Sequence, residues 1–425
     1  MIIGLSKKGE EWEMKANVRF AERMWAAIDV GTTKICVLIA KQLGEDSFDI
    51  IGLGTAPSDG LKKGVVINVT KAVESISVAI KEAELMAGIK LESAYVGISG
   101  AHIKSVNSTG MIPIKGGRIS KSDITKVIES AQAIPIADGQ QILHVMPQHY
   151  IIDGQEPILD PVGMHGVRLE SSVHIITGAV TSVQNLIKCC EMSGVMVSNV
   201  ILEQLASADA VLSEDEKELG VAVLDIGGGT SDLAVYQNGS IRHTMVLPVA
   251  GNHFTNDLAI GLKTTIENAI KVKHEYGSVI MDSETSMLEL EIEKVHGSEL
   301  QTVYQEMLVK ILRPRACELL SLVNNEIHSK KLKRFIPSGF VITGGGSLLY
   351  GMEKLAGEIL GTNVRIGSPK MGFSSPRILN SPIYATSYGL LVHALKKEAL
   401  GSNGLSAPLV SKVFECMRSW VADFF

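Results

Sequence analysis

The sequence has few aromatic residues, few cysteines and no excess of basic charge. Its net charge is −6, so it lacks the positive charge that displaces counterions from phosphates, and nucleic acid is excluded as a partner. The five cysteines are Cys36, Cys189, Cys190, Cys317 and Cys416, and no C-x-x-C pair occurs. This odd, scattered set predicts neither a disulfide framework nor a zinc site, and it favours a reducing cytosol.

Long apolar runs are also missing. No stretch approaches the roughly 20 apolar residues of a spanning helix, so we expect a chain that does not cross a membrane. Residues 1–24 carry charges of both signs and no apolar core, which argues against a signal peptide. We expect them to form a flexible N-terminal extension, with Met14 and Met24 as alternative starts. There is no G-x-x-x-x-G-K-[ST] loop, and no G-x-G-x-x-G follows the first expected strand.

What is present is a unit that occurs twice. Residues 25–40 read WAAIDVGTTKICVLIA and residues 220–236 read GVAVLDIGGGTSDLAVY. Each is a buried apolar strand, an acidic residue, a glycine turn with hydroxyl residues and a second apolar strand. A chain of 425 residues is too long for one ordinary core. Together these features predict a duplicated α/β architecture.

The two turns predict a site for a nucleotide phosphate and a metal. We expect Asp29 and Asp225 to end their strands at a shared cleft, where carboxylates hold a hydrated Mg²⁺. Glycines let backbone N–H groups approach phosphate oxygens, and hydroxyls add further donors. The expected phosphate-binding residues are Gly31, Thr32, Thr33, Lys34, Gly227, Gly228, Gly229 and Thr230, with Ser231 as a further hydroxyl. Lys34 also fits a position that points into solvent, and a lone turn of this kind is most often only a tight turn.

A third glycine cluster lies late in the chain. Residues 340–357, FVITGGGSLLYGMEKLAG, read as a strand, a glycine turn and an amphipathic helix. Such a turn offers a flat backbone surface beside a helix N-terminus. We expect a nucleotide base and ribose to lie on Gly344, Gly345, Gly346 and Ser347.

These motifs together resemble the actin-like ATPase superfamily and, within it, the FtsA family of bacterial cell-division proteins. The most specific stretches are HVMPQHYIIDGQEPILDPVGMHGVRLE (144–170), DIGGGTSD (225–232) and the terminal segment, and the similarity covers nearly the whole chain from residue 25. The resemblance implies an actin-like, duplicated RNase-H-like fold with two lobes, inserted subdomains and a C-terminal amphipathic helix.

The resemblance also implies where the parts begin and end. The expected divisions are 25–100, 180–212 and 381–395 for the first RNase-H-like subdomain, 101–179 for the FtsA-type insert, 213–250 and 336–380 for the second subdomain, 251–335 for its own FtsZ-facing insert, 396–408 for a linker and 409–425 for the terminal helix.

Further roles are carried over from the family one residue at a time. Lys273, rather than Lys271, is expected beside the nucleotide, although Asn268 replaces the glutamate that the family often has just before this stretch. Glu203 is expected to face the γ-phosphate and orient water, with an exposed helical glutamate as the alternative. Arg313 and Arg315 are expected to anchor the FtsZ tail, with ordinary solvated arginines as the alternative. The histidines at 144, 149, 165 and 174 lack ligand spacing and are expected to be structural.

The terminal segment separates apolar from polar side chains when it is placed on a helix. An arc of roughly 160° holds the apolar side. That side comprises Leu409, Val410, Val413, Phe414, Met417, Trp420, Val421, Phe424 and Phe425. A helix docked on the protein's own core and an in-plane membrane helix both fit, and the Gly/Ser/Asn tether together with the resemblance favours the membrane helix. Because Lys412 and Arg418 are balanced by Glu415 and Asp423, lipid binding is expected to depend mainly on apolar burial and only mildly on salt.

The expected function is that of a structural ATPase that binds ATP and Mg²⁺ with at most slow hydrolysis. The resemblance implies a filament of this chain on the cytoplasmic side of the inner membrane at the septum, where it anchors FtsZ and recruits other division proteins. Two alternatives remain at this point. One is an actin-like ATPase of pilus or secretion assembly, and the other is a sugar kinase, for which no catalytic carboxylate is identifiable.

Overall fold

The structure is a computed structural model that describes residues 23–44, 47–281, 288–295, 300–370 and 376–402. The expected N-terminal extension, apart from its last two residues, lies outside this part, and so does the terminal helix with all its apolar residues from Leu409 to Phe425. Among the described residues, no helix is both long and apolar enough to cross a membrane.

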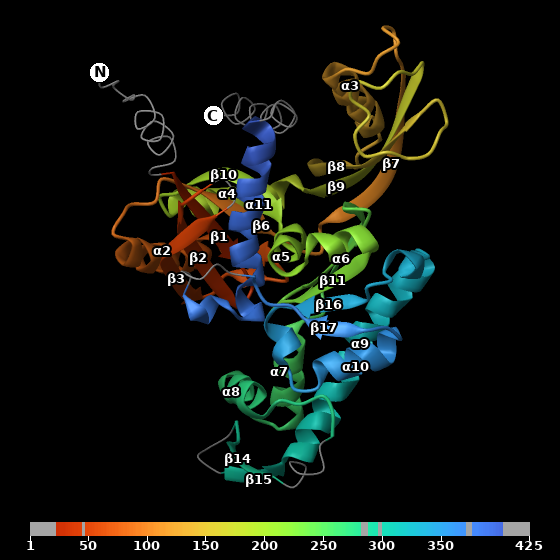
Figure 1. The fold of residues 1–425 in the computed structure, drawn as a ribbon. Coiled ribbons are helices and arrows are strands. Elements are labelled where there is room, and N and C mark those ends of the chain that lie inside the picture. The colour runs from red at the N-terminus through yellow and green to blue at the C-terminus, as the bar shows by residue number, and fades with distance from the viewer. Residues whose placement is uncertain (1–22, 45–46, 282–287, 296–299, 371–375, 403–425) are drawn as a thin grey trace, which may run out of the picture.

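Two similar five-stranded sheets form the centre of the molecule (Figure 1). Each is built on an antiparallel hairpin: β1 (Met24–Val30) with β2 (Lys34–Gln42), and β11 (Val221–Ile226) with β12 (Ser231–Gln237). Because both faces of each hairpin are covered, β2 and β11 are apolar almost throughout and do not alternate. In each sheet the first strand of the hairpin also pairs in parallel with a later strand. The predicted duplicated α/β architecture is confirmed.

The first lobe surrounds the sheet of order β10-β6-β1-β2-β3. Its remaining elements are β3 (Phe48–Pro57), the short ribbon β4 (Leu61–Lys62) and β5 (Val65–Val66), α2 (Val69–Ala87), β6 (Ser93–Ile98), α4 (Val180–Met192), β10 (Met196–Leu202), α5 (Glu203–Val211) and α11 (Ala385–Ser402). Helix α2 packs on β2, β3 and α4, whereas α5 and α11 pack on one another. Asn68 caps the start of α2 by accepting from the Lys71 N–H, and Gly88 ends it in the left-handed conformation.

An inserted body leaves the first lobe after β6 and returns at α4. It consists of β7 (Lys104–Pro113), α3 (Lys121–Gln132), β8 (Gln140–Ile152) and β9 (Arg168–Ala179). The strands form an antiparallel sheet of order β7-β9-β8, and α3 covers β7 and β9. A capping box between Ser120 and Asp123 starts α3, so this helix begins where its sequence signals it.

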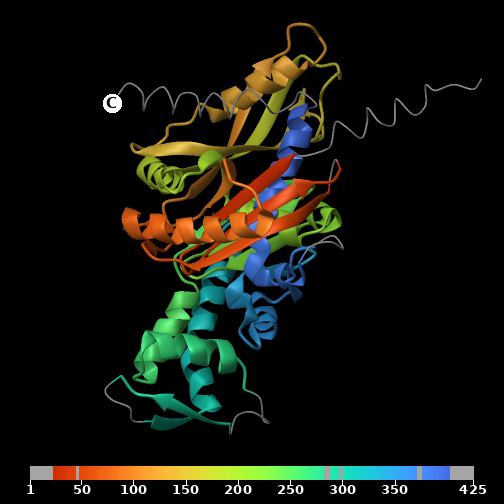
Figure 2. The ribbon, with the colours of Figure 1, turned by 90° about the vertical axis from the view of Figure 1, so that its left-hand side faces the viewer.

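The second lobe surrounds the sheet of order β13-β12-β11-β16-β17. Its other elements are α6 (Glu214–Leu219), β13 (Ser240–Leu247), η1 (Leu332–Phe335), β16 (Phe340–Thr343), η2 (Gly345–Leu348), α10 (Met352–Leu360), β17 (Val364–Ile366), η3 (Arg377–Leu379) and η4 (Pro382–Tyr384). An extension of this lobe contains α7 (Gly251–Gly261), α8 (Ile266–Tyr276), the hairpin of β14 (Glu289–Glu293) and β15 (Leu300–Tyr304), and α9 (Gln305–Ser329). Figures 1 and 2 both show the inserted body and the β14–β15 hairpin at opposite ends of the molecule.

A polar seam joins the inserted body to β13, the edge strand of the second sheet. The Ser105 Oγ donates to the Thr244 carbonyl over 2.9 Å, and the Gln148 Nε2 donates to the Ile241 carbonyl over 2.8 Å. The buried ring of His174 lies between Asn107 and the Thr244 hydroxyl, at 2.6 Å and 2.9 Å. Side chains of the inserted body thus cover part of an edge that would otherwise expose unpaired backbone groups.

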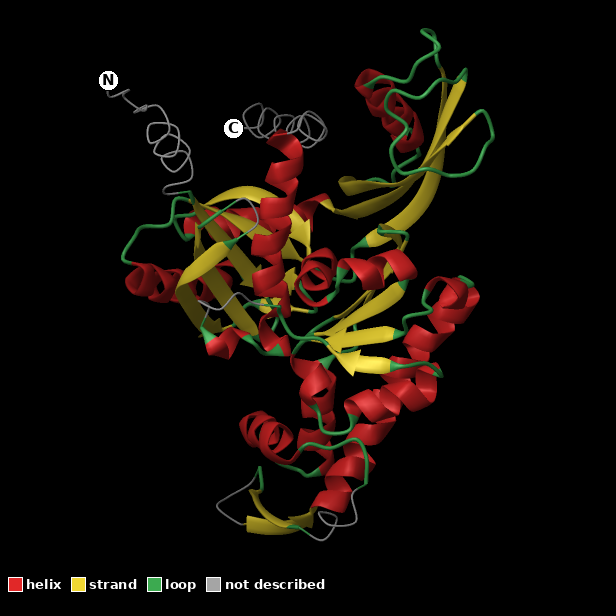
Figure 3. Ribbon diagram, in the orientation of Figure 1, coloured by secondary structure: helices red, strands yellow, loops and turns green. Residues whose placement is uncertain are grey.

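Helix α11 passes from the junction of the lobes along the first lobe (Figure 3). Close packing on α5 requires Gly389, since a Cβ there would lie 1.8 Å from the Ala206 carbonyl oxygen. The helix continues to Ser402, so residues 396–402, expected to belong to a linker, are helical. The run Lys-Lys-Glu-Ala-Leu at 396–400 consists of strong helix formers, and this explains the longer helix.

Candidate functional site

The turns of the two central hairpins meet between the lobes. Gly31 to Thr33 join β1 to β2, and Gly227 to Thr230 join β11 to β12. A Cβ on Gly228 would lie 1.9 Å from the Thr33 Oγ1, and one on Gly229 would lie 2.3 Å from the Thr32 Oγ1. The absence of a Cβ at Gly228 and Gly229 therefore leaves room for the threonine side chains of the first turn. The structure therefore brings the two expected phosphate turns together from halves of the chain that are far apart in sequence.

Two buried carboxylates lie beside these turns and are held by one helix. Asp29 and Asp225 are 7% and 6% exposed. The Ser387 hydroxyl donates to the Asp29 Oδ2 and the Thr386 hydroxyl donates to the Asp225 Oδ2, each over 2.9 Å. Ser387 and Thr386 are adjacent in the first turn of α11, so the start of this helix contacts the acidic residue of each lobe.

Two more carboxylates, those of Glu203 and Asp232, lie in the same region. Burial, together with the charges of Asp29, Asp232 and Asp225, raises the pKa of Glu203 well above its usual value. Burial also raises the pKa of Asp225 to about 6 and that of Asp232 to about 7, although the Thr386 and Ser99 hydroxyls oppose these shifts. Glu203 is partly buried at the start of α5, so the interpretation of a fully exposed helical glutamate does not hold. The result is a concentration of acidic groups at the junction of the lobes.

The third glycine turn lies against the second hairpin. Gly344 follows β16 with a φ of +79°, and a Cβ there would lie 2.2 Å from the Asp225 Oδ1. A Cβ on Gly346 would lie 2.3 Å from the Ile226 Cγ2. The Ser347 hydroxyl closes the turn by donating to the Gly344 carbonyl over 2.7 Å. Gly345 begins the 3₁₀ helix η2 within this turn. A bulkier residue at Gly344 would push the turn away from the acidic residues.

The candidate lysines differ in what they contact. The Lys34 Nζ donates to the Ile383 carbonyl over 3.1 Å and lies 3.9 Å from the centre of the Tyr384 ring. The Lys273 Nζ donates to the Thr255 hydroxyl over 2.8 Å and to the Gly251 carbonyl over 3.3 Å. Burial lowers the pKa of Lys273 to about 8. The Gly251 N–H in turn donates to the Gly227 carbonyl, so Lys273 is linked to the second phosphate turn. Lys271 is exposed and pairs with Glu267.

The two candidate partner-binding arginines lie on α9, away from this junction. Arg315 makes a bidentate pair with Asp257 of α7, with N–O distances of 2.7 Å and 3.0 Å, and also binds Glu318. Arg313 donates to the Val279 carbonyl over 3.2 Å. Both guanidinium groups therefore stabilise the second-lobe extension as well as reaching its surface.

The residues at the junction fit Mg²⁺ and a nucleotide. Carboxylate and hydroxyl oxygens are the ligands and water partners that Mg²⁺ prefers, and the three glycine turns supply backbone surfaces without side chains. Asp29, Asp225 and Asp232 would hold the hydrated ion, and the ion would neutralise charge on the phosphates. Within the described ranges, no three His, Cys, Asp or Glu side chains are grouped closely enough to bind a metal ion directly.

Sequence reasoning missed several of the residues that the fold brings here. Asp232 belongs to the DIGGGTSD motif and receives a hydrogen bond from Ser99 over 2.5 Å. Its place in the motif was a usable signal. For Ser99, Thr386 and Ser387 no local signal existed, because they approach only through pairings of distant segments.

Comparison with known proteins identifies the family. The model of the family described as "Cell division protein FtsA" matches residues 222–389. The model of the "SHS2 domain inserted in FTSA" matches residues 100–177. The cell division protein FtsA of Pseudomonas aeruginosa is 40% identical over 410 residues, which cover 95% of this chain and 98% of the relative. The chain belongs to the FtsA family. FtsA of Escherichia coli is 36% identical and covers 94% of this chain and 96% of its own length.

Solved structures confirm the actin-like fold of this FtsA-family chain. The PilM-PilN type IV pilus biogenesis complex matches with a TM-score of 0.63 at 16% identity, over 87% of this chain and 98% of that chain. MreB5 of Spiroplasma citri bound to AMPPNP matches with a TM-score of 0.56 at 13% identity, over 90% of this chain and 99% of that chain. At these identities the likeness concerns the fold alone. The relatives with 40% and 36% identity are cell division proteins FtsA, so the family is neither that of the pilus-assembly alternative nor that of the sugar-kinase alternative.

Proposed function

We propose that this FtsA-family chain binds Mg-ATP between its two lobes, polymerises on the cytoplasmic face of the inner membrane at the septum, and anchors FtsZ there. The supporting observation is the meeting of both phosphate turns beside Asp29 and Asp225, which are held by adjacent residues of α11. The solved MreB5 relative is described as bound to AMPPNP, a nucleotide analogue, and this is consistent with the proposal.

In this proposal the nucleotide acts mainly as a connection between the lobes. The turns at Gly31–Thr33 and Gly227–Thr230 would supply N–H donors to the phosphates, and the turn at Gly344–Ser347 would support the adenosine. Because each lobe contributes to the same ligand, its presence would set the angle between them and favour or disfavour contacts along a filament. Glu203 would orient water for hydrolysis, which we expect to be slow at most.

The remaining parts of the proposal concern partners. Arg313 and Arg315 on α9 would receive the FtsZ tail, the apolar face of residues 409–425 would lie in the lipid boundary, and later division proteins would join the resulting polymer. Each of these assignments comes from the family resemblance and from the residue pattern. Co-sedimentation with vesicles and FtsZ tests the first two.

Mg²⁺-dependent nucleotide binding is the decisive test. We expect saturable binding of a fluorescent ATP analogue in Mg²⁺ and binding weakened about tenfold or more in EDTA, because the ion neutralises phosphate charge. Asp225→Ala is expected to weaken binding in Mg²⁺ by about tenfold or more and to remove most of the EDTA effect. Asp215→Ala, which changes an exposed aspartate on α6, is the matched control and should bind as the parent does. Absence of binding by the folded parent protein would refute the proposal.

A further inference from the structure

The polar seam between the inserted body and β13 is built around one buried histidine. His174 of β9 is 1% exposed. Its Nδ1 lies 2.6 Å from the Asn107 Oδ1, and its Nε2 lies 2.9 Å from the Thr244 Oγ1. Because the Asn107 Nδ2 donates to the Arg242 carbonyl over 3.2 Å, the Asn107 Oδ1 is the acceptor. His174 therefore donates from Nδ1 and accepts the Thr244 hydroxyl proton at Nε2, and this pattern satisfies a neutral ring.

A second ring proton would disturb this arrangement. Both nitrogens of an imidazolium are donors, so the His174 Nε2 would no longer accept from the Thr244 hydroxyl. The charged ring would also be buried between two uncharged partners, and burying a charge in this way costs free energy. Burial, and to a smaller extent the charge of His243, lowers the pKa of His174 to about 3. The closed seam therefore holds this ring neutral.

The groups around His174 that carry or can take a charge come from the strands and the helix that meet at the seam. They are Lys104 of β7, His144 and His149 of β8, Arg242 and His243 of β13, and Glu326 and Lys330 of α9. All are basic except Glu326, whose carboxylate lies 2.9 Å from the His243 Nε2. Helix α3 lies on the other face of β9, against Val173 and Ile175. The surroundings therefore do not favour a charged His174.

We propose that the polar seam is a proton-sensitive contact: in mild acid the His174 ring becomes charged and the inserted body separates from β13. Separation is favoured because it exposes the charged ring to water, which solvates it. Ser105 and Gln148, whose side chains donate to carbonyls of β13, exchange these hydrogen bonds for bonds to water in the same step. The second lobe can then move without the inserted body.

Proton linkage gives the direction and the size of the effect. In the separated state His174 has its ordinary pKa of 6.5, whereas in the closed state the pKa is lowered to about 3. The stabilisation of the seam is therefore fully present above pH 6.5 and is lost as the pH falls towards 3. The ratio of separated to closed molecules should rise about tenfold between pH 7.5 and pH 5.5 from this residue alone. No residue of the nucleotide site takes part, so the inference does not depend on the proposed function.

The test measures how often the seam opens in the full chain. Gln148 is 6% exposed within the seam, so Gln148→Cys places a thiol there that reacts when the seam separates. Its labelling rate with a disulfide reagent, divided by that of a free cysteine peptide at the same pH, gives the open fraction. We expect this fraction to rise about tenfold or more from pH 7.5 to pH 5.5. Cys36, buried in the first lobe, should be labelled far more slowly at both pH values, since only global unfolding exposes it.

Histidine variants in the reporter chain decide whether His174 is the group that responds. His174→Gln removes the titrating ring and keeps a side chain that can donate and accept. The rise with acid should be about tenfold smaller in this variant, whatever its absolute labelling rate, so a weaker seam does not imitate the result. His165→Gln changes an exposed imidazole elsewhere on the inserted body and should keep the full rise.

A second reporter guards against a defect of the first. Ser105→Cys replaces the other side chain that donates to β13, and it should show the same ratio between the two pH values. An equal rise in chains with and without the His174 ring would overturn the proposal. So would an open fraction that stays constant from pH 7.5 to pH 5.5 while the native ring is in place.

Discussion

At the scale of single residues, two hydroxyls of α11 orient the acidic pair of the nucleotide site. Thr386 donates to Asp225 and Ser387 donates to Asp29, each over 2.9 Å. Thr386→Val keeps the shape and removes the donor. We expect it to raise the Mg²⁺ concentration needed for half-maximal nucleotide binding by about tenfold, since residues that orient metal-side carboxylates affect affinity to this extent.

The matched comparison for this prediction uses two other variants in the same Mg²⁺ titration. Thr386→Ser restores the hydroxyl and should return most of the affinity. Thr302→Val, on an exposed position of β15, should have no effect. An unchanged Mg²⁺ midpoint in Thr386→Val would show that the hydroxyl does not position Asp225.

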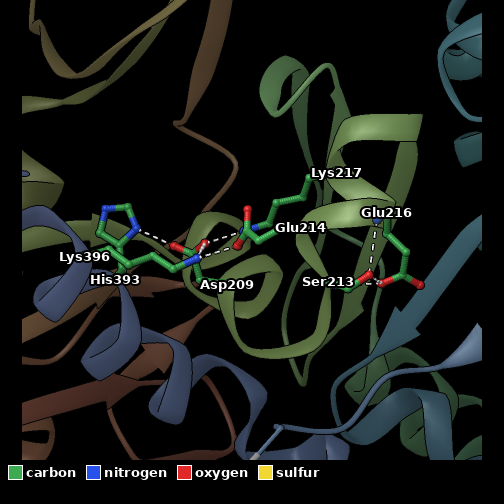
Figure 4. Close-up of polar contacts among 7 residues, drawn as sticks. All are labelled: Asp209, Ser213, Glu214, Glu216, Lys217, His393 and Lys396. Carbon is green, nitrogen blue, oxygen red and sulfur yellow. Dashed lines mark hydrogen bonds and ion pairs between the residues drawn. The ribbon is translucent and has the colours of Figure 1, made fainter. Parts of the chain in front are cut away.

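At the scale of elements, an ion network joins α5, α6 and α11 (Figure 4). Asp209 of α5 lies 2.7 Å from the Lys217 Nζ and 2.7 Å from the His393 Nδ1, and Lys396 bridges Asp209 and Glu214. The Lys217 side chain is only 5% exposed. Asp209→Ala would leave this ammonium buried with only the longer contact to the exposed Glu214, so we expect a loss of about 3 kcal/mol and a lower Tm.

The network also predicts a dependence on acid. The hydrogen bond from His393 and the charges of Lys217 and Lys396 outweigh burial and hold the pKa of Asp209 far below its usual value of 3.8. Because the folded-state pKa is lowered, the stabilisation is fully present above the unfolded pKa and is lost as the pH falls below it. Thermal unfolding between pH 3 and 7 should therefore show a steeper acid limb in the parent than in Asp209→Ala.

Glu214→Ala is the control for the element-scale prediction. Its carboxylate binds the same two lysines but is 75% exposed, so the variant should lose no more than about 1 kcal/mol. Equal losses in Asp209→Ala and Glu214→Ala would show that burial does not make the difference.

At the scale of the whole molecule, the proposed function requires the terminal segment to bind lipid and α9 to bind FtsZ. We expect the full chain to pellet with vesicles and to carry FtsZ with it, whereas a chain that ends at Ser406 stays in solution together with FtsZ. Apolar burial dominates the expected binding, so about 0.3 M added salt should weaken it only mildly.

Variants on α9 separate the two parts of this prediction, which are lipid binding by the terminal segment and FtsZ binding by α9. Arg315→Ala should still pellet but should carry less FtsZ, and Lys310→Ala should carry FtsZ as the parent does. If the truncated chain pellets like the full chain, the tail is not the anchor. If Arg315→Ala carries FtsZ normally, its pairing with Asp257 is purely structural.

The sequence by itself determined the parts that depend on neighbouring residues. The two hairpins follow from apolar runs on either side of a glycine turn, and such local patterns specify strands and turns without help from the rest of the chain. The same motifs were sufficient to predict the FtsA family and the actin-like fold. Helix α11 extends beyond residue 395, where the sequence predicts its end, because the residues that follow are strong helix formers.

Only the tertiary structure decided which side chains meet. Thr386 and Asp225 are 161 positions apart, and Ser387 and Asp29 are 358 positions apart. The contact of Lys34 with Ile383 and that of His174 with Thr244 likewise depend on how separate segments pack. No periodicity in one sequence encodes such pairs, because each is fixed by sheet pairing and helix packing between segments that lie far apart along the chain.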